Sequence, residues 1–324
     1  MVIKFLLAKP RVFYYSNIGS DYMPRTESPF RYPGGKTQLY DFILNLINTN
    51  NTTHTYCEPF AGGSGLPMKL LINNDVDSVW INDFDKSIYS VWKNIIDHPN
   101  ALIKRINRVP FDIHGSKYSD EYNIEFWKEQ RKIYFEKKNY QNSIDNAFAT
   151  LFLNRTNTSG IITGGPIGGI SQKNTKIYVR FNKKTLIDKI NLIHSLSDRI
   201  KLTRKNALEL IPLMKESLST ENDFIFFDPP YFEQGAHLYY SSFDKDGHKD
   251  LAKEILSLDE HKWITTYDKN PQINEMYSTA KNRFEYELNY SANNFNRGKR
   301  PELMFASPTL KIESHKPVFL TDIT

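Results

Sequence analysis

A short turn-forming motif, Asp228-Pro229-Pro230-Tyr231, follows four apolar residues (224–227, FIFF) that are typical of a buried strand. Two consecutive prolines cannot continue a sheet ladder, and they restrict the local backbone. The turn can therefore aim the Asp228 carboxylate and the Pro229 carbonyl at one point. Two converging acceptors suit an aryl amine, because hydrogen bonds to both of its N–H protons make the nitrogen more nucleophilic. Tyr231 would then supply a stacking face.

A glycine-rich segment, EPFAGGSG (58–65), follows a second short strand that ends at Tyr56 and Cys57. Glycines at such a turn let backbone N–H groups approach a ligand closely. Asp83 ends the next predicted strand, where a carboxylate can accept hydrogen bonds from ribose hydroxyls. Taken alone, Asp83 could equally be a helix cap. The glycine loop at this spacing favours ligand binding.

Three other motifs do not carry the chemistry that they first suggest. RYPGGKT (31–37) lacks the first glycine of a phosphate-binding loop, because Phe30 occupies that position. DKDG (244–247) has no glutamate at the later position that a calcium loop needs, so we predict a turn. The single cysteine, Cys57, stands at a strand end, and we expect it in the core. It cannot form an internal disulfide, which fits a reducing compartment.

The composition is that of a globular protein with a mild excess of basic residues. The 324 residues are 40% hydrophobic and 24% charged, with a net charge of +5, which is compatible with a polyanionic partner. The sequence has no run of about 18 apolar residues, so we predict no membrane-spanning helix. The apolar start lacks a small-residue cleavage site, so we expect no signal peptide and a cytoplasmic location.

The hydrophobic pattern predicts a doubly wound α/β domain that is interrupted once. Strand, glycine loop, helix, strand and acidic strand end follow one another from residue 55 to 85, and the pattern resumes near residue 200. Between them lie charged helical segments and a polar, glycine-rich stretch (154–176). We predict an arm (1–27), a catalytic domain (28–100 and 205–324) and a largely helical insertion (101–204).

These motifs, in this order, resemble the Dam-like family of DNA adenine-N6 methyltransferases, the D12 class or alpha group. The resemblance covers roughly residues 28–310 and includes RYPGGK, EPFAGGSG, INDFD, FLNRTNTSG with RFNKKTL, FFDPPY and ITTYD. It implies a Rossmann-like fold with a mostly parallel sheet of seven strands, one of them antiparallel. The implied cofactor is S-adenosyl-L-methionine, with no metal. The implied reaction is methylation of the N6 amine of an adenine that is flipped out of duplex DNA.

The resemblance also assigns roles to residues. Tyr32 and Lys36 would approach the methionine end of the cofactor, Lys36 facing its carboxylate, and Asp83 would bind the ribose. Further cofactor contacts are expected from two loops and the turn: Glu58, Phe60 (on the adenine), Ala61, Gly62, Gly63, Asn206, Ala207 and Asp228. Asn154 and Arg155 fall where the family enters DNA. Asn157 and Gln172 join them as expected DNA contacts, because such side chains can hydrogen-bond base edges.

Alternatives remain open at this point. The same turn could hold the amine of cytosine, giving N4 methylation. Enzymes with an NPPY turn act on RNA or on protein glutamine, but position 228 is Asp. A catalytically idle DNA-binding protein that senses the cofactor is the alternative outside the enzymes. We expect a monomer or a weak dimer near the nucleoid of a prokaryotic or phage-infected cell, and a cognate restriction endonuclease stays open as a partner.

Overall fold

A computed structural model describes residues 26–31, 36–232, 244–290 and 298–323. The first elements are η1 (Lys36–Leu39), α1 (Tyr40–Asn50), β1 (Thr55–Glu58), α2 (Gly65–Ile72), β2 (Ser78–Asn82) and α3 (Lys86–Asp97). The middle of the chain forms α4 (Pro99–Asn107), β3 (Phe111–Asp112), β4 (Gly115–Ser116), α5 (Asp120–Lys137), α6 (Ile144–Thr156), η2 (Thr158–Gly160), η3 (Ile177–Arg180), α7 (Lys183–His194) and η4 (Ser197–Arg199). The last part forms β5 (Ile200–Thr203), α8 (Ala207–Ser217), β6 (Phe224–Phe227), α10 (Lys245–Leu256), β7 (Lys262–Asp268), α11 (Pro271–Met276), β8 (Asn282–Tyr290), β9 (Gly298–Ala306) and β10 (Thr321–Asp322).

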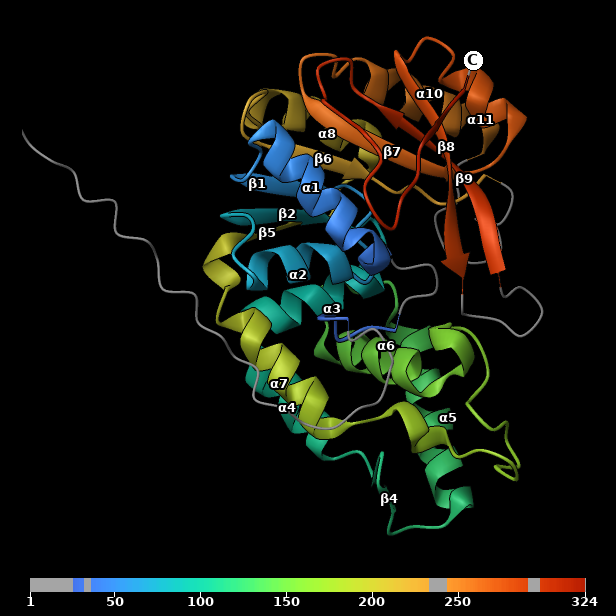
Figure 1. Cartoon of the computed structure of the whole chain (residues 1–324). Coiled ribbons are helices and arrows are strands. Elements are labelled where there is room, and N and C mark those ends of the chain that lie inside the picture. The colour runs from blue at the N-terminus through green and yellow to red at the C-terminus, as the bar shows by residue number, and fades with distance from the viewer. Residues whose placement is uncertain (1–25, 32–35, 233–243, 291–297, 324) are drawn as a thin grey trace, which may run out of the picture.

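One large sheet organises the molecule, with the strand order β10-β8-β9-β7-β6-β1-β2-β5 (Figure 1). Neighbours from β7 to β5 pair in parallel, whereas β9 is antiparallel to both β7 and β8. The α/β fold with a mostly parallel sheet is therefore confirmed. The sheet has eight strands rather than the predicted seven, because two residues near the C-terminus, β10, add an antiparallel edge to β8.

Helices cover both faces of the sheet, which explains why its central strands are apolar throughout. Along β6, Phe224 and Phe226 pack into the layer that contains α1, α2 and α3. Ile225 and Phe227 pack into the layer that contains α8, α10 and α11. Cys57 is fully buried in this second layer, as predicted.

The helices from α4 to α7 extend the first layer rather than forming a separate body. They lie together beneath the sheet in Figure 1. Their apolar side chains, such as Leu102, Phe152 and Ile190, belong to the same buried cluster as Val79 of β2. The sheet resumes at β5, which pairs with β2 inside the range predicted for the insertion (101–204).

The helical spacing of apolar residues from Leu186 to Ile200 predicts a helix over this range, but α7 ends at His194. Tertiary contacts override its helical pattern, since the Arg199 guanidinium donates to the backbone carbonyls of Asp77 and Val76, at 2.7 and 2.8 Å. These bonds hold the chain beside the start of β2, where it continues as β5. The predicted DKDG turn is instead a helix start, where the Asp244 carboxylate caps α10 by accepting from the Gly247 N–H at 2.8 Å.

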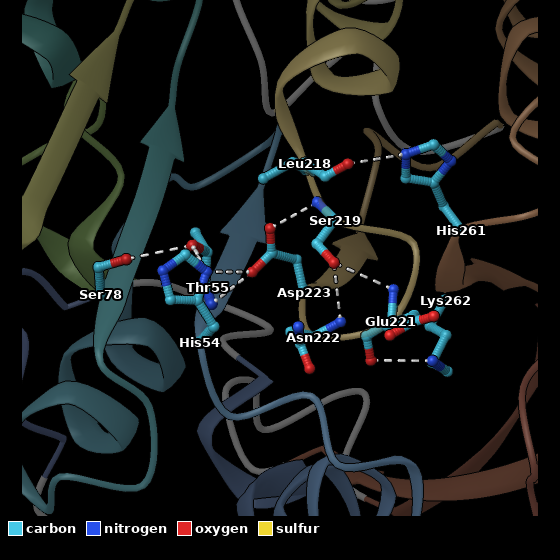
Figure 2. A network of polar contacts seen from close by, with 10 residues as sticks. All are labelled: His54, Thr55, Ser78, Leu218, Ser219, Glu221, Asn222, Asp223, His261 and Lys262. Carbon is cyan, nitrogen blue, oxygen red and sulfur yellow. Dashed lines mark hydrogen bonds and ion pairs between the residues drawn. The ribbon is translucent and has the colours of Figure 1, made fainter.

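A buried carboxylate ties together the loops at the N-terminal end of the sheet (Figure 2). Asp223 precedes β6, and one of its oxygens accepts from the Thr55 N–H and contacts His54 Nδ1, at 2.8 and 2.7 Å. Its other oxygen accepts from the Ser219 N–H at 2.8 Å. These bonds fix where β1 and β6 begin, and so where they end at the opposite edge. Among the described helices, none has the length and apolar character needed to cross a membrane.

Candidate active site

The turn after β6 places Asp228 at the C-terminal end of the central strands. Its side chain is 27% exposed, and its Oδ1 accepts from Thr266 Oγ1 of β7 at 2.9 Å. The same oxygen lies 3.3 Å from Lys36 Nζ. No described residue donates to Oδ2. One carboxylate oxygen is therefore anchored and the other is available, as the predicted amine acceptor requires.

Lys36 lies against this turn, buried at the start of η1. Its ammonium donates to the Tyr231 hydroxyl at 2.8 Å and to Glu302 Oε2 at 3.2 Å. These contacts, together with that to Asp228, point the ammonium at protein oxygens. They do not indicate the predicted role of facing a cofactor carboxylate. Tyr32, which was predicted beside Lys36, lies outside the described residues.

Glu302 of β9 is the main site residue that the sequence analysis missed. Its carboxylate is 1% exposed, and it accepts from Tyr231 and Tyr286, with O–O distances of 2.7 and 2.6 Å. No motif marks this glutamate, because its partners Lys36 and Tyr286 come from opposite ends of the chain. Only the pairing of β9 with β7 and β8 brings it to the Asp228 turn.

The charged groups at the turn shift one another's pKa values. Burial raises the pKa of Asp228, and Glu302 adds to this effect, whereas Lys36 and the Thr266 hydrogen bond oppose it. Burial alone would lower the pKa of Lys36, but the carboxylates of Asp228 and Glu302 raise it above its usual value. Lys36 therefore stays protonated, and its positive charge is shared between two carboxylates.

The glycine-rich loop after β1 contacts Asp83 directly. The Gly62 N–H donates to Asp83 Oδ2 at 2.8 Å, and the Asp85 N–H donates to Oδ1 at 2.9 Å. Gly62 has a φ of +47°, a conformation that glycine adopts without strain. Trp92 of α3 donates its indole N–H to the Gly62 carbonyl at 3.0 Å. Burial raises the pKa of Asp83 to about 7.

Asn82, another residue not singled out from the sequence, joins this loop to the one after β5. Its amide nitrogen donates to the carbonyls of Pro59 and Lys205, at 2.9 and 3.1 Å. Its oxygen accepts from the Lys205 N–H at 2.9 Å. This amide brings the predicted contacts Phe60 and Asn206 to the same edge of the sheet. Asn206 also caps α8 by accepting from the Leu208 N–H at 3.0 Å.

The remaining predicted cofactor contacts also lie on these two loops. Glu58 is 7% exposed at the end of β1, and its carboxyl accepts from the Tyr56 hydroxyl at 2.8 Å. Burial raises the pKa of Glu58 well above its usual value. Three small residues are also buried where predicted: Ala61, Gly63 and Ala207.

Three of the four predicted DNA contacts are buried amides that hold the loops after α6. Asn154 accepts from the Arg31 N–H at 2.7 Å and donates to the carbonyls of Arg31 and Gly160, at 2.8 and 2.9 Å. Asn157 donates to three loop carbonyls, and Gln172 donates to two. None is more than 1% exposed. In this conformation, these side chains cannot reach a base edge without breaking the loop.

Arg155 differs, because it belongs to a cluster of guanidinium groups. It donates to the Arg180 carbonyl from Nε and Nη2, at 3.1 and 2.7 Å. Burial, followed by the neighbouring charges of Arg31 and Arg180, lowers the pKa of Arg155 to about 9. Neither Arg31 nor Arg155 forms an ion pair with a described carboxylate. A shallow pocket beside the cluster is lined by two arginines, by Ser and Thr residues, by a glycine and by two apolar side chains: Arg31, Thr158, Ser159, Ile167, Gly168, Thr175, Val179 and Arg180.

The donor set of this edge fits a cofactor with a ribose and an amino acid end. The Asp83 carboxylate lies next to a backbone N–H group of the glycine loop, the buried carboxyl of Glu58 stands at the end of β1, and the partly exposed carboxylate of Asp228 follows β6. S-adenosylmethionine, the cofactor that the resemblance implies, has both of these parts. Within the described part of the chain, no group of three or more His, Cys, Asp or Glu side chains could hold a metal ion.

Comparison with known proteins gives one family match, which spans most of the chain. The family model of the D12 class N6 adenine-specific DNA methyltransferases matches residues 32–291. The Type II methyltransferase M1.LlaDCHI of Lactococcus lactis subsp. cremoris is 25% identical over 225 residues, which are 68% of this chain and 71% of that protein. The Type II methyltransferase M.CviBI of Paramecium bursaria Chlorella virus NC1A is 22% identical over 262 residues, which are 80% of this chain and 89% of that protein.

Among solved structures, an rRNA methyltransferase of Streptomyces viridochromogenes, AviRa, aligns over 85% of this chain and 86% of that one. The TM-score is 0.37 and the sequence identity is 13%.

Proposed function

Because the chain belongs to the D12 class of N6 adenine-specific DNA methyltransferases, we propose that its Asp228 turn holds the amine of a flipped-out adenine. The supporting observation is the asymmetry of the Asp228 carboxylate. Oδ1 is fixed by Thr266 and Lys36, whereas no described group donates to Oδ2. That oxygen accepts one amine N–H, the Pro229 carbonyl accepts the other, and the Tyr231 ring stacks on the base.

In this proposal the chain acts mainly by positioning its substrates. S-adenosylmethionine, when bound, supplies an electrophilic methyl group. The Asp83 carboxylate binds the ribose hydroxyls, while Phe60 and Asn206 lie beside the adenine ring of the cofactor. Glu58 contributes a buried carboxyl at the methionine end. Flipping the target base costs a few kcal/mol, which contacts to the DNA must supply.

For the DNA we propose a phosphate contact at the cluster of Arg31, Arg155 and Arg180. Burial and neighbouring guanidinium charges lower the pKa of Arg31 and of Arg155, and such a concentration of positive charge favours a polyanion. The adjacent pocket offers the hydroxyl groups of Thr158, Ser159 and Thr175 beside apolar side chains. The insertion (101–204) thus keeps its proposed role in DNA binding through Arg155. Asn154, Asn157 and Gln172 build the loops that present the arginines.

Two relatives named Type II methyltransferases support a further proposal, that this protein protects DNA from a cognate restriction endonuclease. Such action implies the cytoplasm of a prokaryotic or virus-infected cell.

The test is methyl transfer from labelled S-adenosylmethionine to duplex DNA, with the methylated nucleosides identified by mass spectrometry. The wild type should form N6-methyladenine, and Asp228→Ala should form none while it still binds the cofactor. N4-methylcytosine as the product would instead support the cytosine alternative. No methyl transfer in a single turnover would indicate a protein that only senses the cofactor.

A further inference from the structure

Glu302 is a buried glutamate whose position in the chain gives no hint of a role. It lies on β9, the antiparallel strand beside β7, and its carboxylate is 1% exposed. Taking a carboxylate out of water is costly unless donors replace the lost hydration. Among the described residues, the Lys36 ammonium and the hydroxyls of Tyr231 and Tyr286 do so.

Two of these donors belong to the Asp228 turn or touch it. Lys36 Nζ lies 3.2 Å from Glu302 Oε2 and 3.3 Å from Asp228 Oδ1, so a single ammonium bridges both carboxylates. Lys36 also donates to the Tyr231 hydroxyl, which in turn donates to Glu302 Oε1 at 2.7 Å. Lys36, Tyr231 and Glu302 thus form a closed ring of hydrogen bonds beside Asp228.

We propose that Glu302 is a positioning residue of the methyl-transfer site. Its carboxylate holds the Tyr231 ring in place, and it weakens the electrostatic attraction between Lys36 and Asp228. The inference rests on the proposed role of the Asp228 turn. Without Glu302, the whole charge of Lys36 would act on Asp228, and the Tyr231 hydroxyl would lose its buried acceptor. The turn would then hold the amine with a weaker acceptor and a looser stacking face.

The charge of Glu302 also raises the pKa of Asp228, as does burial. Removing that charge should therefore lower the Asp228 pKa. The other titratable groups that face the two carboxylates come from every neighbouring element: Lys36 of η1, Tyr56 and Glu58 of β1, Tyr231 of the turn, Tyr267 of β7 and Tyr286 of β8.

The experiment compares Glu302→Gln with Glu302→Asp, using Glu285→Gln as the matched control. Glu285 lies on the adjacent strand β8, where it forms an ion pair with Lys269. The first readout is the Asp228 pKa, measured without cofactor or DNA by NMR of carboxyl-labelled aspartate and assigned with Asp228→Asn. The second readout is kcat for DNA methylation, together with KM for the cofactor.

Glu302→Gln should lower the Asp228 pKa and reduce kcat about ten- to hundredfold, with a smaller change in KM. Glu302→Asp keeps the charge but is one methylene shorter, so the Asp228 pKa should stay closer to that of the wild type while kcat still falls. Glu285→Gln should change neither quantity.

An unchanged Asp228 pKa in Glu302→Gln would overturn the inference, as would a kcat within about twofold of the wild type. The NMR readout needs no turnover. If the wild type formed no N6-methyladenine, the proposed function would fail, while the pKa comparison would still report on the influence of Glu302.

Discussion

Replacing Asn154 with Ala should destabilise the protein rather than remove a contact to DNA. The buried side chain lies near the end of α6 and makes three hydrogen bonds: two partly buried bonds to the backbone of Arg31 and one buried bond to the Gly160 carbonyl. The net contribution of each is about 0.5–1.5 kcal/mol, and buried groups left without a partner cost more. The free energy of unfolding should therefore fall by about 2–4 kcal/mol.

The substitution should also weaken cofactor binding, because Arg31 begins the segment of the chain that leads to Lys36. Urea denaturation gives the stability, and calorimetry gives the S-adenosylmethionine affinity, which should weaken. The matched control is Asn94→Ala, which removes a buried asparagine whose amide donates within its own helix, to the Ser90 carbonyl. It should leave cofactor affinity close to that of the wild type.

The competing account, in which Asn154 contacts a base, makes the opposite prediction. It expects wild-type stability and cofactor affinity together with weaker or less specific DNA binding. That combination would refute the anchoring role and return Asn154 to the DNA interface.

Four further outcomes are expected. Asp83→Ala should weaken cofactor binding by roughly 1–3 kcal/mol in calorimetry, because the ribose hydroxyls lose their acceptor. Since the pKa of Asp83 is about 7 and binding requires the charged form, the wild-type affinity should be full above pH 7 and fall below it, whereas a flat profile would exclude the ribose role. Gly160→Ala should lower the unfolding free energy, because φ is +78° and a Cβ would stand 2.4 Å from the Arg31 carbonyl oxygen; equal thermal stability would contradict that geometry. Arg155→Ala should weaken DNA binding and make its salt dependence shallower by about one ion, with no change in cofactor affinity; an unchanged salt slope would remove the phosphate contact.

The sequence predicted the sheet well because its signals are local. The buried strand 224–227, the glycine loop and the acidic strand end each depend on a few adjacent residues, and all three appear where expected. The same local signals brought Asp228, Asp83 and the glycine loop to one edge, since parallel strands end together.

The other residues of the candidate site could not be predicted, because contacts between distant parts of the chain bring them together. Glu302 meets Lys36 across 266 positions, and no spacing rule reaches that far. The burial of Asn154, Asn157 and Gln172 was not predicted, because polar residues in a glycine-rich stretch suggest an exposed surface. The backbone carbonyl groups of such a stretch are not paired in a helix or sheet. Buried amide side chains donate hydrogen bonds to them instead.

The most direct test of the central claim is the methylated product formed by the wild type and by Asp228→Asn in a single turnover. The substitution keeps the shape of the side chain and removes its charge. We predict N6-methyladenine from the wild type, a loss of rate of several orders of magnitude in the variant, and cofactor affinity within a few-fold. Wild-type turnover by Asp228→Asn would contradict the account, because the Asp228 carboxylate would then not be the group that holds the amine.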